Sequence, residues 1–77
     1  MIIKILGSGC ANCKKLFANT QEAVQELNLD VKIEEVKDLD EIINYGVMKT
    51  PALVVNEKVK ASGRVLGKEE IKKFLVG

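Results

Sequence analysis

The sequence predicts an α/β fold in which strands and helices follow one another in the order βαβαββα. Two observations lead to this prediction. Short runs rich in β-branched residues alternate with stretches of helical period, and the last two predicted strands follow each other across a short turn. The chain has 77 residues, which is room for one hydrophobic core, so we expect a single domain over residues 1–77.

The first half of the chain predicts a strand, a long helix and a second strand. Residues 2–6 read IIKIL, and the glycine-containing segment 7–9 follows as a turn. Between Cys13 and Leu27, apolar residues recur at spacings of three, four and seven, the helical period. Asn28 ends this helix, and alternation over 31–36 predicts a strand polar enough for a sheet edge. The strand–helix–strand unit predicts a right-handed crossover between parallel strands.

A short helix is expected next. Asp38 and Glu41 have the spacing of a capping box at a helix start, and Gly46 stands where a left-handed cap would end the helix. Leu39, Ile42 and Ile43 supply its apolar stripe.

The second half of the chain predicts a hairpin and a final helix. Residues 52–55 form an apolar run too short for a helix, and 59–63 return as an antiparallel partner. The connecting Asn56-Glu57 is a poor two-residue turn because Glu resists positive φ, so a longer or bulged loop is an alternative. After Gly67, apolar residues at helical spacing predict a helix over 68–76.

Composition excludes several classes of function. Twelve basic against eleven acidic residues give a net charge of +1, which removes the electrostatic case for a nucleic acid or an acidic membrane. No apolar run approaches the roughly 18 residues of a membrane span. The N-terminal apolar segment is too short for a signal peptide, so we expect a cytoplasmic protein. Histidine is absent, which excludes histidine relays and mixed Cys/His zinc sites.

The only two cysteines, Cys10 and Cys13, form a CxxC motif between the first strand and the long helix. A structural disulfide is disfavoured, because so short a loop removes only about 2 kcal/mol of unfolded-chain entropy and a cytosol tends to reduce it. Redox exchange and capture of a soft metal such as Cu(I) or Zn(II) remain.

The helix position of the motif predicts a different role for each sulfur. Cys10 at the helix start sees the positive end of the helix dipole, which lowers the pKa of its thiol. Cys13 lies on the apolar stripe and should be shielded. Cys10 would then attack a substrate disulfide, and Cys13 would attack the resulting mixed disulfide and release the reduced substrate.

These features resemble the thioredoxin fold, in particular its small prokaryotic redox-active disulfide proteins. The resemblance rests on CxxC between a strand and a long helix, on Pro51 ahead of the third strand and on the element order, and it covers residues 1–77. It implies a four-stranded mixed sheet with helices on both faces. It also implies a cis Thr50–Pro51 bond, a Thr50 backbone that pairs with an extended substrate, and Gly63 keeping the substrate groove open.

The sequence also departs from the pattern of larger relatives. It has no Trp. Its first strand has Lys4 and no acidic residue, so the buried carboxylate that larger thioredoxins use as a proton acceptor near the second cysteine is missing. Arg64 follows Gly63, whereas glutaredoxins carry a Gly-Gly and a following Asp for glutathione. The resemblance therefore implies electrons from a flavoprotein of the thioredoxin reductase kind.

Taken together, we expect a monomeric protein-disulfide oxidoreductase without a cofactor, whose partners are disulfide-containing substrate proteins and that reductase. The alternative is a metal-binding module. Small metallochaperones with CxxC run βαββαβ and end in a strand, whereas this chain ends in a predicted helix. A third possibility is an adaptor that uses the same fold for contact with other proteins and has no redox activity. No specific feature of the sequence supports it.

Overall fold

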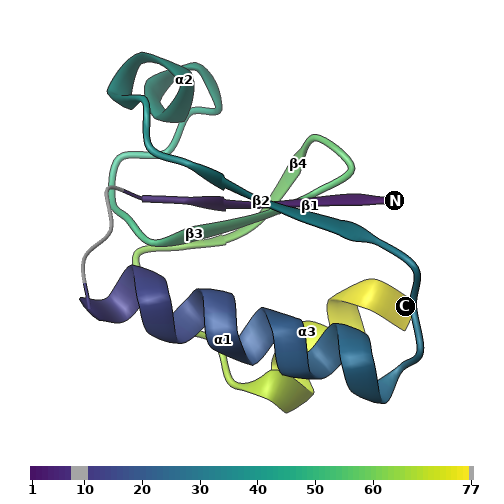
Figure 1. Ribbon diagram of the computed structural model, residues 1–77. Coiled ribbons are helices and arrows are strands. Elements are labelled where there is room, and N and C mark those ends of the chain that lie inside the picture. Colours follow the sequence, from purple (N-terminus) through teal and green to yellow (C-terminus); the bar gives the residue numbers. More distant parts are fainter. Residues whose placement is uncertain (8–10, 77) are drawn as a thin grey trace.

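A computed structural model describes residues 1–7 and 11–76 and contains a four-stranded mixed sheet in the order β2-β1-β3-β4 (Figure 1). The elements are β1 (Ile2–Leu6), α1 (Ala11–Glu26), β2 (Lys32–Val36), α2 (Leu39–Asn44), β3 (Ala52–Val55), β4 (Lys58–Ser62) and α3 (Lys68–Val76). β1 pairs parallel with β2 and antiparallel with β3, and β3 pairs antiparallel with β4. The predicted α/β fold, its element order and the edge position of β2 are confirmed. Within the described ranges, no helix is long and apolar enough to cross a membrane.

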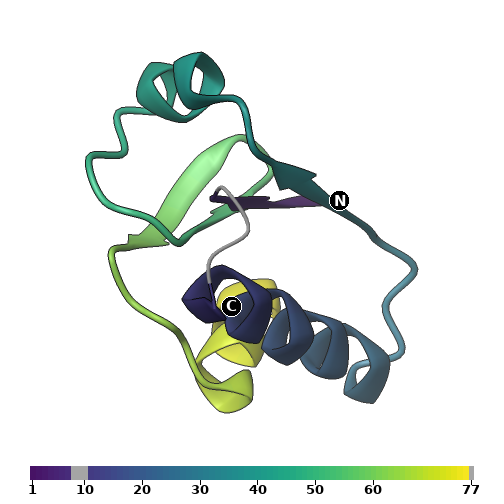
Figure 2. The ribbon, with the colours of Figure 1, turned by 60° about the vertical axis from the view of Figure 1, so that its left-hand side comes forward.

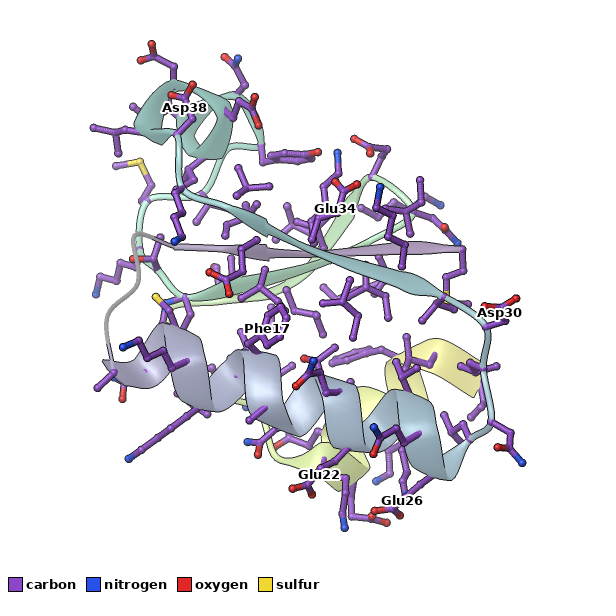
Figure 3. The ribbon with its side chains drawn as sticks, viewed as in Figure 1. Phe17, Glu22, Glu26, Asp30, Glu34 and Asp38 are labelled. Atoms are coloured by element: carbon purple, nitrogen blue, oxygen red, sulfur yellow. The ribbon has the colours of Figure 1, made fainter. Side chains whose placement is uncertain are left out.

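Helices cover both faces of the sheet. α1 and α3 lie side by side on one face, and α2 lies on the other (Figures 1 and 2). Each face has its own apolar cluster, because successive side chains of a strand point to opposite sides. In β1, Ile3 and Ile5 face α1 and α3, whereas Leu6 belongs to the cluster below α2. Phe17 points from α1 toward the sheet and packs against the larger cluster (Figure 3).

The ends of α2 use the residues that the sequence predicted. The Asp38 carboxylate accepts a hydrogen bond from the backbone N–H of Asp40 at 3.0 Å, so the cap bond comes from the second helical residue and not from Glu41. Gly46 has φ +79° and follows the helix, which confirms the left-handed stop. Asp38 lies where the chain leaves β2 and enters α2 (Figure 3).

The predicted apolar stripe of α2 is wrong in part. Ile42 is buried, but Leu39 and Ile43 are exposed. The helix has only six residues and buries only Ile42 against the sheet, whereas the side chains of Leu39 and Ile43 project away from the core.

The hairpin between β3 and β4 has the two-residue turn that the sequence disfavoured. Asn56 and Glu57 have φ of 51° and 68°, and a register shift lies within the strand pair. Distant partners hold this conformation. Asn56 Oδ1 accepts from the Ile2 N–H at 3.2 Å, and the Glu57 carboxylate accepts from Lys4 Nζ at 2.9 Å and from the Tyr45 hydroxyl at 2.8 Å. These tertiary contacts offset the local cost of a left-handed glutamate.

An ion-pair cluster joins the exposed sides of α1 and α3. The Glu26 carboxylate lies 2.6 Å from Lys68 Nζ and also accepts a hydrogen bond from Lys72, while Glu22 lies 3.8 Å from Lys68 (Figure 3). The hydrogen bonds from Lys68 and then Lys72 lower the pKa of Glu26 below its ordinary 4.5. The two contacts of Glu26 with α3 therefore depend on its carboxylate being ionised.

The cluster predicts a pH-dependent effect of Glu26→Gln. Because the folded-state pKa is depressed, the contribution of Glu26 to stability is present above its unfolded pKa and is lost as pH falls through the folded value. We expect a small decrease in Tm at pH 7 that shrinks as pH falls below 4.5. Thermal unfolding across pH 3–7 measures this. Glu35→Gln is the control. It removes the same charge from an exposed carboxylate whose ion pair with Lys37, at 3.9 Å, is longer than the pair of Glu26 with Lys68. A Tm difference for Glu26→Gln that stays constant over this range would contradict the prediction.

Candidate functional site

Cys13 lies in the first turn of α1 and is turned toward the sheet. Only 5% of its surface is exposed, which agrees with the shielded position predicted for it. It is disulfide-bonded. From Ala11 to Lys14 the helix carries no acidic residue that would offset the positive end of its dipole. Cys10 lies outside the described residues, so the role predicted for its thiolate stays a prediction.

Gly7 makes room for the sulfur of Cys13. It follows β1, and its N–H continues the sheet by donating to the Val36 carbonyl at 2.9 Å. A Cβ atom at Gly7 would overlap Cys13 Sγ and would lie 3.2 Å from Cys13 Cβ and 3.8 Å from Thr50 Cβ. The end of β1, the start of α1 and the loop before β3 therefore meet at this one position.

The predicted substrate-binding residues Thr50, Pro51 and Gly63 lie at the end of the sheet where Gly7 follows β1. The Thr50–Pro51 peptide bond is cis, Pro51 is buried and Thr50 is exposed. The Pro51 carbonyl accepts a hydrogen bond from the Gly63 N–H at 2.9 Å. The structure thus brings Thr50, Pro51 and Gly63 to the same end of the sheet as Cys13, while their roles in substrate binding remain predictions.

Two features of Gly63 favour glycine at this position: its positive φ and the close approach of the Lys49 side chain. Its φ is +74°, a conformation that L side chains rarely adopt. A Cβ there would lie 3.2 Å from Lys49 Cβ and 3.5 Å from Lys49 Cδ, so the stem of Lys49 rests on this glycine.

Gly7 and Lys49 are two residues at this site that sequence reasoning did not single out. Gly7 was assigned to a turn, although its position between a strand and the CxxC motif was a signal for a close approach. The only indication that Lys49 belongs to the site was its position in the sequence directly before Thr50.

The comparison with known proteins decides the family. A family model described as Thioredoxin domain matches residues 1–76. The chain belongs to the thioredoxin domain family. A protein named thioredoxin from Methanothermobacter thermautotrophicus is 48% identical over 75 residues, covering 97% of both chains. A thioredoxin from Methanocaldococcus jannaschii is 35% identical over 75 residues, covering 97% of this chain and 86% of the relative. The resemblance predicted from the sequence is confirmed, and the family places the chain among thiol–disulfide oxidoreductases.

Lys4 lies in the first strand of this thioredoxin-family protein and has two side-chain partners. Lys4 donates a hydrogen bond to the Tyr45 hydroxyl at 2.8 Å and forms an ion pair with Glu57 at 2.9 Å. The hydrogen bonds to Tyr45 and then Glu57 raise the pKa of Lys4, so it stays protonated at neutral pH. Lys4 is therefore a cation at neutral pH and not a proton acceptor.

The described residues contain no cluster of side chains suited to bind a metal ion. Over 1–7 and 11–76, no three His, Cys, Asp or Glu side chains gather as potential ligands. A tetrahedral zinc site needs four ligands. Two thiolates of a CxxC motif would supply only half of such a zinc site.

Proposed function

We propose that this protein reduces disulfide bonds in other proteins through a Cys10–Cys13 dithiol and disulfide cycle. The observation that supports this most directly is the setting of Cys13. It is a buried, disulfide-bonded sulfur at the start of a helix, packed against Gly7 and beside Thr50, in a chain of the thioredoxin family.

The proposed reaction moves two electrons in two exchange steps. The Cys10 thiolate attacks one sulfur of the substrate disulfide, a Cys10–substrate bond forms, and the other substrate sulfur leaves as a thiolate. The Cys13 thiol then loses its proton to solvent or to the departing thiolate and attacks Cys10 Sγ. This forms the Cys10–Cys13 disulfide and releases the second substrate thiolate. The substrate is reduced, and the dithiol is oxidised.

The surroundings of Cys13 suit an extended substrate. Thr50 is exposed beside Cys13, and its backbone could pair with a substrate segment in the manner of an added strand. We propose that the oxidised protein is returned to the dithiol by a flavoprotein of the thioredoxin reductase kind, in the cytoplasm, and that the chain acts as a monomer without a cofactor of its own.

The test is reduction of a protein disulfide such as that of insulin, with dithiothreitol as electron donor and free thiols as the readout. We expect catalysis at micromolar protein, and the metal content of the isolated protein is measured in parallel. Absence of catalysis together with one bound Cu(I) or Zn(II) per chain or per dimer would support metal binding and reject the proposal.

Cys13→Ser should trap the first intermediate. Without the Cys13 thiol, no group of the same protein attacks the Cys10–substrate disulfide, so covalent complexes accumulate. They disappear when dithiothreitol is added. Mass spectrometry under non-reducing conditions measures them. Ala23→Ser is the matched control, because it also places a hydroxyl at a buried position of α1. The assignment fails if the two variants form equal amounts of complex.

A further inference from the structure

Tyr45, Lys4 and Glu57 form a closed ring of hydrogen bonds, which we call the Tyr45 network. Lys4 Nζ donates to the Tyr45 hydroxyl at 2.8 Å and to Glu57 Oε1 at 2.9 Å, and the Tyr45 hydroxyl donates to Glu57 Oε2 at 2.8 Å. The Lys4 ammonium also lies 5.5 Å from the centre of the Tyr45 ring, within the range of a cation–π contact. The network joins β1, the residue that follows α2 and the turn between β3 and β4.

The backbone of Glu57 indicates that its carboxylate is needed in this place. Glu57 has φ of 68° in a two-residue turn, where Gly is the favoured residue. A left-handed backbone costs free energy in a residue other than glycine, and it persists where surrounding contacts determine the conformation. Those contacts are the hydrogen bonds from Lys4 and Tyr45. The turn therefore holds a residue with an unfavourable backbone whose carboxylate reaches Tyr45.

Tyr45 fixes the C-terminal end of α2 to the sheet. Apart from it, α2 has a weak hold, because the helix buries only Ile42. The half-buried Tyr45 ring packs against the apolar cluster below α2. Its backbone N–H donates to the carbonyls of Glu41 and Ile42 at 3.3 and 3.2 Å, so the ring and the helix end are one unit. The hydroxyl then ties this unit to β1 and to the hairpin turn.

The segment that presents Thr50 begins at Tyr45. Val47 is buried, residues 48–50 are exposed, and Pro51 is buried again. The exposed segment therefore lies between two anchors, the Tyr45 network with Val47 before it and Pro51 after it. Loss of the hydroxyl should loosen the first anchor without removing it, because Val47 stays buried.

We propose that Tyr45 is a positioning residue, whose hydroxyl fixes the segment that presents Thr50 to an extended substrate. The inference rests on the proposed function and deepens it. The Cβ of Thr50 lies 3.8 Å from the Cβ position at Gly7, against which Cys13 packs, so a shift of this segment changes how a paired substrate meets the redox site. Tyr45 itself does not touch the substrate and acts through Thr50.

Tyr45→Phe tests the inference, because it keeps the ring and removes only the hydroxyl. We expect the KM for a peptide disulfide to rise about fivefold, the fold-change that corresponds to one net hydrogen bond. The kcat should be unchanged, since the loss concerns binding and not the exchange step. Hydroxyethyl disulfide is too small to pair with Thr50, and its reduction should keep the wild-type rate.

Lys4→Met tests whether the network acts as a unit. It keeps the length of the side chain and removes the ammonium. The KM for the peptide should rise as in Tyr45→Phe, and the double variant should add little to either single variant, because both substitutions break the same contact. Glu26→Gln is the matched control for stability. It breaks contacts between α1 and α3 on the other face of the sheet and should leave the KM unchanged.

Each other outcome has a definite meaning. If the wild type reduces neither the peptide nor hydroxyethyl disulfide, the proposed function fails and the inference fails with it. If Tyr45→Phe leaves the peptide KM unchanged, or slows both substrates equally, the inference is overturned and the proposed function stands. An equal rise of KM in Glu26→Gln would indicate a general loss of stability and would also overturn it. Additive effects of Lys4→Met and Tyr45→Phe would do the same, because the two residues would then act independently.

Discussion

Cys10→Ser should lower the catalysed reduction of protein disulfides to the uncatalysed background, the largest effect expected of any single substitution. The first step of the proposed reaction needs a thiolate, and the hydroxyl of serine is neither ionised at neutral pH nor able to form the mixed disulfide. The loss should be complete even though Cys13 is retained, because Cys13 is buried and a protein disulfide cannot reach its sulfur. Free thiols released from insulin in the presence of dithiothreitol measure the effect.

Alkylation of the reduced protein tests the same assignment without a substrate. With iodoacetamide near pH 7, one thiol should react quickly in the wild type and in Cys13→Ser. In Cys10→Ser the remaining thiol should react slowly, since it is shielded between α1 and the sheet. Equal and slow reaction of both thiols, or retained catalysis in Cys10→Ser, would show that Cys10 is not the nucleophile.

Gly7→Ala should have the second largest effect, because one methyl group would occupy the space of Cys13 Sγ. Overpacking of this kind costs about 1 to 3 kcal/mol of unfolding free energy, and about 4 to 8 °C of Tm is lost per kcal/mol in a domain of this size. Catalysis should fall as well, since the sulfur of Cys13 is displaced from its position beside Thr50. After reduction, Sγ can rotate about the Cα–Cβ bond, so the loss of stability should be larger for the oxidised protein.

Gly67→Ala is the matched control for Gly7→Ala. Neither glycine has a positive φ, so alanine is conformationally acceptable at both positions, and no atom lies within 4 Å of a Cβ at Gly67. Gly67 precedes α3, where alanine is a poorer helix cap than glycine, so we expect Gly67→Ala to lose less stability than Gly7→Ala and to react like the wild type. Thermal unfolding and insulin reduction compare the two variants. A similar Tm and rate for both would mean that Gly7 does not confine Cys13.

Several elements could be predicted because their causes lie within a few residues. The helical period after Cys13, the cap at Asp38 and the left-handed stop at Gly46 depend on neighbours one or two turns away. The polarity of β2 likewise indicated its place at the sheet edge. The motif itself identified Cys13 as a buried sulfur on the apolar stripe, because its spacing from Leu16 follows the same period.

Other features depended on partners that no local pattern reveals. The left-handed Glu57 is held by Lys4 and Tyr45, and Lys4 is 41 positions from Tyr45 and 53 from Glu57 in sequence. Leu39 and Ile43 were assigned to the apolar stripe of α2 but are exposed, since periodicity shows that a residue lies on an apolar stripe and not whether the helix is long enough to bury it.

The sequence by itself determined the family, the order of the elements and the two cysteines on which the proposed chemistry depends, because periodicity, caps and motif spacing are local properties of the chain. Only the tertiary structure decided that Gly7 confines Cys13, that Lys49 rests on Gly63 and that Thr50 lies beside Gly7. Each of these contacts joins different elements or loops of the chain, and their distances follow from how the helices and loops pack on the sheet.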